Sequence, residues 1–186
     1  GTESFTWELR VVESTGPEVE PDPTATVDPG ETGEVIGRSP GMATEYVGRP
    51  HESEHLTVDG WLRTGDVARI DPDGLLYIVD RVDNMIVSGG ENVYPQEVEG
   101  VLTAHEDVSA AAVVGREDER WGQRIAAVVA VTGDVTEADL DAYCKAHDEL
   151  ADFKRPREYV ITRESFPRTS TGKIQRGDVR TKFFEE

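Results

Sequence analysis

A change of pattern near residue 80 constrains the fold of this chain more than any other feature. Before it, short alternating or apolar runs are separated by Gly, Pro, Asp and Thr, which predicts strands joined by turns. These runs cover residues 7–13, 33–38, 67–70 and 75–79. The sequence Asp71-Pro72-Asp73-Gly74 between the last two runs is typical of a β-hairpin turn. Residues 1–81 are therefore predicted to form a β-rich subdomain.

After residue 80, helical and strand patterns alternate. Helices are predicted to begin at Pro95, after the capping-box sequence that starts at Thr136, and over residues 176–184. Strands are predicted over residues 108–114, 125–131 and 159–162. The sequence therefore predicts an α+β class, in which residues 82–186 form a small second domain. Its sheet is expected to be mostly antiparallel and three-stranded, with helices on its flanks.

The net charge of the chain excludes one large class of partners. The sequence carries 38 acidic and 19 basic side chains, which gives a net charge of −19 and a pI near 4.5. A nucleic-acid-binding protein needs a basic face for phosphate contacts, so no nucleic-acid partner is expected. An acid excess of this size also indicates a salt-adapted source, where ions screen the self-repulsion. No apolar run approaches the roughly 20 residues of a membrane span.

Cys144 is the single cysteine of the sequence. No internal disulfide is possible, which predicts a reducing, cytoplasmic compartment. Its place on a predicted helix beside Leu140 and Tyr143 favours the role of a small core residue. The start of the chain, Gly1-Thr2-Glu3, resembles neither a signal peptide nor a natural initiator, which indicates a piece of a longer protein.

Residues 151–180 reverse the charge of the rest of the chain, with eight basic and four acidic side chains. At the centre lies the loop from Pro167 to Lys173, which ends in a flexible glycine and a long cationic side chain. This pattern is typical of an anion site, and a solvated basic loop is the alternative. The loop is not a nucleotide-binding P-loop, because Pro167 and Ile174 replace the Gly and the Ser or Thr that the P-loop motif requires.

The sequence His51-Glu52-Ser53-Glu54-His55 matches the H-E-x-x-H pattern of zinc hydrolases. That pattern binds zinc only where both histidines share one face of a stable helix and a third ligand follows. Pro50 precedes the pattern, and Thr57-Val58-Asp59-Gly60 ends any helix within about two turns. A zinc hydrolase that uses His51 and His55 is therefore a disfavoured alternative, and no metal site is predicted in this chain.

Two further polar clusters flank the change of pattern. Residues 61–66 are predicted to form a turn that ends at Asp66, where a carboxylate can accept two hydrogen bonds from a diol such as ribose. An aspartate that caps a turn is the structural alternative. Residues 80–92 combine a charged segment, a short apolar strand and the pair Gly89-Gly90. Adjacent glycines permit close approach of a ligand, and a Gly-Gly hairpin turn is again the alternative.

In their order and spacing these clusters resemble the C-terminal part of acyl-adenylate-forming enzymes, the group that contains acyl-CoA synthetases, aryl-CoA ligases and luciferases. The resemblance runs from about Trp7 to Arg180. The sequences from Arg120 to Gln123 and from Leu150 to Pro156 are most similar to the aryl-CoA ligases.

The resemblance implies roles for individual residues. Asp66 would bind the ribose hydroxyls of ATP with Arg81 nearby. Asp83 would be the hinge of a mobile C-terminal lid, and Lys173 would be the catalytic lysine of adenylation. The implied CoA contacts are Gly89, Gly90, Glu91, Trp121, Phe153, Arg155 and Arg157.

The resemblance also implies an AMP-forming acid–thiol ligase with ATP, Mg²⁺, CoA and a small-molecule carboxylic acid as its reactants and metal. The phosphate loop, the magnesium-linked carboxylate and the acyl pocket would lie in an N-terminal domain of the same enzyme. This chain alone is therefore expected to be inactive. Two alternatives are a free-standing nucleotide- or CoA-binding module and an adenylation domain that charges a carrier protein. The implied contacts at Trp121 and Arg155 favour free CoA.

Overall fold

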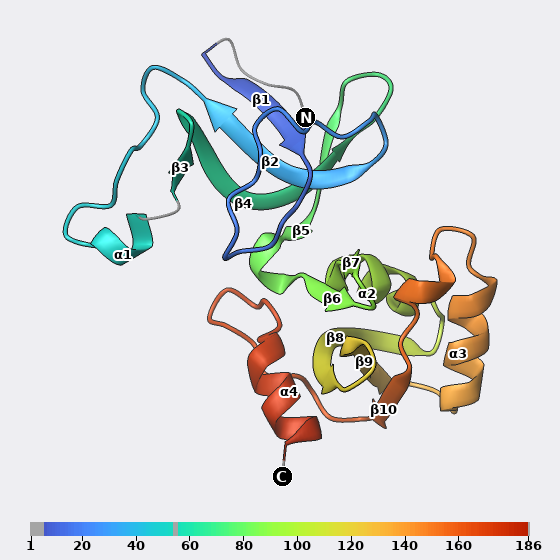
Figure 1. Ribbon diagram of the computed structural model, residues 1–186. Coiled ribbons are helices and arrows are strands. Elements are labelled where there is room, and N and C mark those ends of the chain that lie inside the picture. Colours follow the sequence, from blue (N-terminus) through green and yellow to red (C-terminus); the bar gives the residue numbers. More distant parts are fainter. Residues whose placement is uncertain (1–5, 54–55, 186) are drawn as a thin grey trace. The chain divides into compact units, whose positions relative to one another are not determined.

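The computed structural model describes residues 6–53 and 56–185. The chain divides into two compact units, Gly1–Met85 and Ile86–Glu186. Each unit contains one five-stranded sheet, and the helices concentrate in the second unit (Figure 1). The predicted α+β class is confirmed.

The sheet of the first unit is antiparallel. Its strands are β1 (Glu8–Val12), β2 (Thr32–Arg38), β3 (Thr57–Val58), β4 (Trp61–Ile70) and β5 (Leu76–Arg81). Strand β2 pairs with β1 and β4, and β4 also pairs with β3 and β5. Successive side chains of a strand point to opposite faces. Val12 and Ile36 therefore pack in one apolar cluster, and Val11 and Val35 pack in another.

The prediction of a turn over residues 61–66 is wrong, because strand β4 begins at Trp61 and runs through this segment. The buried side chains of Trp61 and Val67 fix the strand at both sides of the polar stretch. The residues Thr64, Gly65 and Asp66 interrupt the strand pattern in the sequence, because Gly and Asp are depleted in strands. The pairing of β4 with β2 is irregular here, with a register shift between Glu34 and Ile36 on β2.

Strands β8 (Val108–Asp118) and β9 (Gly122–Val131) form the long antiparallel hairpin of the second unit. Strand β10 (Glu158–Thr162) adds to β9 in parallel. A short hairpin of β6 (Ile86–Ser88) and β7 (Glu91–Val93) joins β9 through the pairing of Ser88 with Gly122. The sheet thus has five strands rather than the predicted three. The sequence indicates the short apolar strand and, as the alternative, a Gly-Gly hairpin turn, but not β7 or the pairing with β9, because strands of three residues carry little periodicity.

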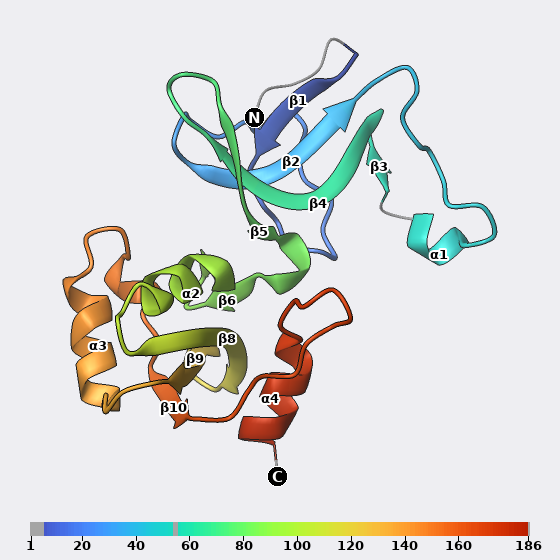
Figure 2. The same ribbon diagram turned by 180° about the vertical axis from the view of Figure 1, so that it is seen from behind.

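The helices of the second unit cover both faces of this sheet. They are α2 (Pro95–Thr103), α3 (Glu137–Ala146) and α4 (Arg176–Phe184), with 3-10 turns η1 (Val82–Asn84) before the unit and η2 (Asp152–Lys154) within it. Figures 1 and 2 show α3 and α4 on opposite sides of the sheet. The predicted capping box of Thr136 and Asp139 at the start of α3 is confirmed.

The alternation of β8 and β9 explains this layering. Val113 and Ile125 face a core that includes Leu102 of α2 and Leu140 of α3. Cys144 lies in the same core, so its predicted packing role is confirmed. The other face of the hairpin packs against α4 and the segment before it, through Ala112, Val128, Phe166 and Val179. No helix in the described residues has the length and apolar character of a membrane span.

Candidate functional site

Asp66, Arg81 and Asp83 form a charged cluster at the end of the β4–β5 pair. Asp66 lies opposite Arg81 in the sheet register. The Nη1 atom of Arg81 donates to Oδ1 of Asp66 at 3.0 Å, and its Nη2 atom donates to Oδ2 of Asp83 at 3.2 Å. Burial alone would lower the pKa of Arg81, but the hydrogen bonds and charges of the two carboxylates outweigh it and raise the pKa. The guanidinium is therefore a fixed positive charge between two acids.

The irregular stretch of β4 at residues 64–66 determines the geometry of this charged cluster. Gly65 has a φ of +69°, and a Cβ at this position would lie 2.6 Å from Nη2 of Arg81. Thr64 fixes the neighbouring backbone, because its Oγ1 donates to the carbonyl of Val35 at 2.7 Å and accepts from the Asp66 N–H at 3.0 Å. A glycine is required here because only it combines positive φ with room for the guanidinium.

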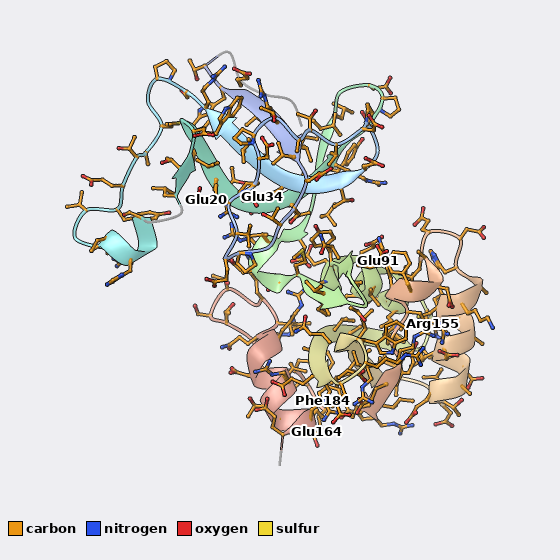
Figure 3. The ribbon with its side chains drawn as sticks, in the orientation of Figure 1. Glu20, Glu34, Glu91, Arg155, Glu164 and Phe184 are labelled. Atoms are coloured by element: carbon orange, nitrogen blue, oxygen red, sulfur yellow. The ribbon has the colours of Figure 1, made fainter. Side chains whose placement is uncertain are left out.

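A buried ion pair between Glu34 and Arg63 joins the neighbouring strands β2 and β4. Nε and Nη2 of Arg63 each lie 2.9 Å from a carboxylate oxygen of Glu34, and the two side chains are 6% and 0% exposed. Nη2 also donates to the carbonyl of Gly16 at 3.3 Å. Figure 3 labels Glu34 in the first unit. The pair contributes to the wall of a hollow of about 250 Å³ that Thr64, Gly65 and Arg81 also line.

The end of β5 and the turn η1 place two buried residues close in sequence to one exposed carboxylate. Asp80 is buried, and its Oδ1 accepts from the Arg81 N–H and from Nδ2 of Asn84, both at 2.7 Å. Val82 is also buried. Asp83, which follows Val82, has a side chain that is 63% exposed. Residue 83 therefore lies between the buried Val82 and Asn84, which is bonded to Asp80, while the Asp83 side chain faces solvent.

Lys173 lies on a loop that is closed by its own hydrogen bonds. Thr169 holds both sides of its backbone: the Thr169 N–H donates to the Lys173 carbonyl at 2.8 Å, and the Lys173 N–H donates to Thr169 Oγ1 at 3.1 Å. Gly172 turns the chain with a φ of +86°. Within the described part of the chain, the ammonium group of Lys173 has no ion-pair partner. The loop thus presents a free positive charge to solvent.

The pair Gly89-Gly90 is the turn of the β6–β7 hairpin, with φ values of +63° and +90°. The Gly89 N–H donates to the carbonyl of Trp121 at 2.9 Å, and a Cβ on Gly89 would lie 2.8 Å from the indole ring. Trp121 is 45% exposed and carries the guanidinium of Arg120 over its ring at 4.5 Å. The structure therefore brings together Gly89, Gly90 and Trp121, with Glu91 exposed on the next strand.

Phe153, Arg155 and Arg157 lie on or beside η2 but differ in their surroundings. Phe153 is an exposed aromatic ring. The side chain of Arg155 is 13% exposed and pairs with Asp141 of α3 and with Asp152. Figure 3 shows Arg155 beside α3. Arg157 is more open and donates to the carbonyl of Asp152 at 3.1 Å. Arg155 is thus already neutralised by internal carboxylates, unlike Lys173.

The zinc pattern finds no support in the structure. The helix α1 (Pro50–Ser53) has four residues, too few for two histidines four positions apart to share its face. His51 lies on α1, and His55 lies outside the described residues. Across residues 6–53 and 56–185, no group of three or more His, Cys, Asp or Glu side chains is placed to hold a metal ion.

The comparison with known proteins identifies a known domain family within the second unit. Residues 97–173 match the model of the AMP-binding enzyme C-terminal domain. The chain contains an AMP-binding C-terminal domain. Feruloyl-CoA synthase from Amycolatopsis sp. is 40% identical over 184 residues, which cover 98% of this chain and 35% of the relative. The long-chain-fatty-acid–CoA ligase FadD13 of Mycobacterium tuberculosis is 44% identical over 152 residues, 81% of this chain and 30% of the relative.

Solved structures agree with this assignment of the AMP-binding C-terminal domain. The O-succinylbenzoate coenzyme A synthetase of Bacillus subtilis, solved with AMP, has a TM-score of 0.77 at 32% identity over 97% of this chain and 34% of its own. Among curated sequences, the fatty acid–acyl-carrier-protein ligase ScoC of Streptomyces coeruleorubidus is also similar, at 40% identity over 84% of this chain and 30% of its own. The chain spans about a third of the length of the curated relatives it matches.

Sequence reasoning missed two ion pairs: the buried pair of Glu34 with Arg63 and the part-buried pair of Glu99 with Arg176. Their partners are 29 and 77 residues apart, so no local spacing relates them. The available signal was the place of each acid within an element. Glu34 sits in an apolar strand, and Glu99 follows the apolar stripe of α2, where an unpaired charge would be costly.

Proposed function

We propose that this chain supplies the C-terminal part of an AMP-forming acyl- or aryl-CoA ligase. The observation that carries the proposal is the free ammonium of Lys173, which a closed loop presents at the end of the matched AMP-binding C-terminal domain. The similarity to feruloyl-CoA synthase over nearly the whole chain supports the same reaction class.

In the first step, a carboxylate oxygen of the acid attacks the α-phosphorus of ATP, and the bond to pyrophosphate breaks. Both reactants are anions, so a cation between them lowers the barrier by electrostatic stabilisation. Lys173 suits this task, because an ammonium on a long stem acts as a movable point charge. Asp66 would accept hydrogen bonds from the ribose hydroxyls while Arg81 holds its carboxylate in place. The described residues contain no cluster of side chains that could hold Mg²⁺.

In the second step, a thiol attacks the carbonyl carbon of the acyl-adenylate, and AMP leaves. Lys173 must then give way to a surface that admits the thiol. We assign this surface to the Gly89-Gly90 turn and Trp121, where glycines leave room for a narrow chain. Residues 82–186 would rotate as a lid about Asp83, whose neighbours Val82 and Asn84 are held by burial and by a hydrogen bond to Asp80. Residues 1–81 would remain with the N-terminal domain.

The nature of the thiol separates the proposal from its nearest rival. Exposed Trp121 and Phe153 can stack on an adenine ring, which favours free CoA. The similarity to the carrier-protein ligase ScoC favours a carrier-protein thiol as the second candidate. Thioester formation with CoA and with phosphopantetheinylated carrier protein distinguishes the two. A Trp121→Ala variant should lose activity with CoA by about tenfold, the equivalent of about 1.4 kcal/mol.

The test of the proposed function is a separation of half-reactions in the full-length protein. Lys173→Ala should abolish adenylate formation, measured as acid-dependent pyrophosphate release, and spare thioester formation from a supplied acyl-adenylate. Lys182→Ala is the matched control, since Lys182 is an exposed lysine of α4 that pairs with Glu164. Equal loss of both half-reactions in Lys173→Ala, or loss of neither, contradicts the role of Lys173.

A further inference from the structure

A bidentate ion pair joins two helices that pack on opposite faces of the second sheet. Nε and Nη2 of Arg176 in α4 donate to Oε1 and Oε2 of Glu99 in α2, at 2.7 and 2.6 Å. The side chains of Arg176 and Glu99 are 21% and 15% exposed. Two parallel charge-assisted bonds fix direction as well as distance, which a single lysine contact does not.

The same carboxylate also binds the edge of the sheet. Oε1 of Glu99 accepts from the N–H of Val113 at 2.9 Å. Val113 lies opposite Ala127 in the antiparallel β8–β9 pair. Its N–H points away from β9, as alternate residues of such a pair do. Glu99 therefore satisfies a backbone donor of β8 that has no partner on β9. Glu99 on α2 thus accepts hydrogen bonds from β8 and from α4, although α4 packs on the other face of the sheet.

Arg176 stands at the first position of α4, three residues after Lys173. A cation there faces the positive end of the helix macrodipole, so the helix itself disfavours it. The Glu99 carboxylate offsets this cost. The side chain of Arg176 thus serves an interaction outside its own helix.

The loop that carries Lys173 is tied internally and needs an external anchor. The Gln175 N–H donates to the carbonyl of Pro167 at 3.0 Å and closes the base of the loop. Phe166 and Ile174 pack on the face of the sheet that α4 covers. Such apolar contacts are non-directional. Arg176, three residues after Lys173, supplies a directional anchor to another element through its pair with Glu99.

We propose that Glu99 and Arg176 are positioning residues that aim the Lys173 loop for the adenylation step. This inference rests on the proposed role of Lys173. The pair connects the base of the loop to α2 and β8, so the ammonium keeps a fixed position relative to the body of the lid. It makes no contact with a reacting atom and acts only through the loop.

The test compares both half-reactions in full-length Arg176→Met and Glu99→Gln. Arg176→Met keeps an apolar stem, and Glu99→Gln keeps an oxygen for the Val113 N–H while it removes the charge. Adenylate formation should fall by about 10- to 100-fold, the loss expected for a catalytic group misplaced by about 1 Å. Thioester formation from supplied acyl-adenylate should stay within about twofold of wild type. Amide hydrogen exchange at residues 168–174 should accelerate in both variants.

Parallel variants separate failure of this inference from failure of the proposed function. If Lys173→Ala keeps adenylation, the role of Lys173 is wrong and the inference falls with it. If Lys173→Ala loses adenylation while Arg176→Met and Glu99→Gln keep it, only the positioning role is overturned. Equal loss of both half-reactions in the two variants shows a merely structural pair and also overturns it. Should Arg176→Met fail to fold, Arg176→Lys, which keeps one charged contact, undergoes the same comparison.

Discussion

The Nη1 atom of Arg81 lies 3.0 Å from the Oδ1 atom of Asp66, and the two residues face each other across the β4–β5 pair. The same Nη1 atom donates to the Thr64 carbonyl at 2.8 Å, so the guanidinium fixes both the carboxylate and the strand that carries it. Both side chains are partly exposed. A ligand diol can therefore reach Asp66 while Arg81 restrains its rotation.

The proposed ribose contact of Asp66 predicts how nucleotide use responds to a substitution at this residue. Asp66→Asn keeps the shape of the side chain but removes the charge that strengthens hydrogen bonds to hydroxyl groups. In the full-length enzyme the KM for ATP should rise about tenfold, in line with hydrogen bonds to charged groups of about 1.5–3 kcal/mol. The preference for ATP over 3′-deoxy-ATP should shrink together with it. Steady-state kinetics with both nucleotides measure the two effects.

Asp73→Asn is the control for this prediction. Asp73 is an exposed acid of the β4–β5 turn in the same unit, so its charge change should leave both nucleotides unaffected. An Asp66→Asn enzyme that still discriminates against 3′-deoxy-ATP as strongly as wild type would remove Asp66 from the ribose site.

The hinge proposal makes a prediction for Asp83. Proline fixes φ near −65° and removes a backbone donor. Asp83→Pro should therefore slow thioester formation by at least about tenfold while adenylate formation changes less, because only the second step needs the rotated lid. Asp83→Ala is the matched control. It also breaks the exposed ion pair with Arg81 but keeps rotation about φ, so both half-reactions should remain close to wild type. A wild-type thioester rate in Asp83→Pro rules out this pivot.

Local patterns predicted most elements of this fold but not the way they come together. Pro95 and the Thr136–Asp139 capping box gave correct helix starts, because the residues that decide them lie within one turn. The strand through Thr64 and Asp66 was missed because its pairing with β2 and β5, not its propensity, determines it. Local sequence patterns could not predict the positioning of Lys173 for a similar reason. It depends on Glu99, which is close to Arg176 only in the folded chain.

Burial of Cys144 predicts a pH dependence of stability. The side chain is 1% exposed, and desolvation raises the pKa of its thiol. The unfolded chain ionises a thiol near pH 8.5. The folded state prefers the neutral thiol, so this stabilisation is complete below that pH and declines as the pH rises through the higher folded pKa. The free energy of unfolding should therefore fall as the pH rises above about 8.5, in part because of Cys144.

Urea denaturation of this chain over that pH range measures the effect, with Cys144→Ala as the comparison. The variant should be less stable at neutral pH because of the cavity, but its stability should decline less steeply with pH. Alkylation of Cys144 by iodoacetamide at pH 8 should also be much slower in the folded chain than in urea. Equal pH slopes in the two proteins would show that the thiol does not ionise with unfolding in the way its burial predicts.

The buried pair of Glu34 and Arg63 predicts an asymmetric response to substitution. Removing one partner leaves a buried charge without compensation, so Arg63→Met should destabilise the first unit by about 3–5 kcal/mol. The double variant Glu34→Met with Arg63→Met removes both charges and should recover much of that loss.

Arg163→Met is the control, because Arg163 pairs with Asp134 in a largely exposed setting and should change stability by less than about 1 kcal/mol. Urea unfolding followed by tryptophan fluorescence reports the first unit through Trp61, which is buried in its core. A double variant as unstable as Arg63→Met alone would show that the pair contributes through shape and hydrogen bonding to Gly16 rather than through charge compensation.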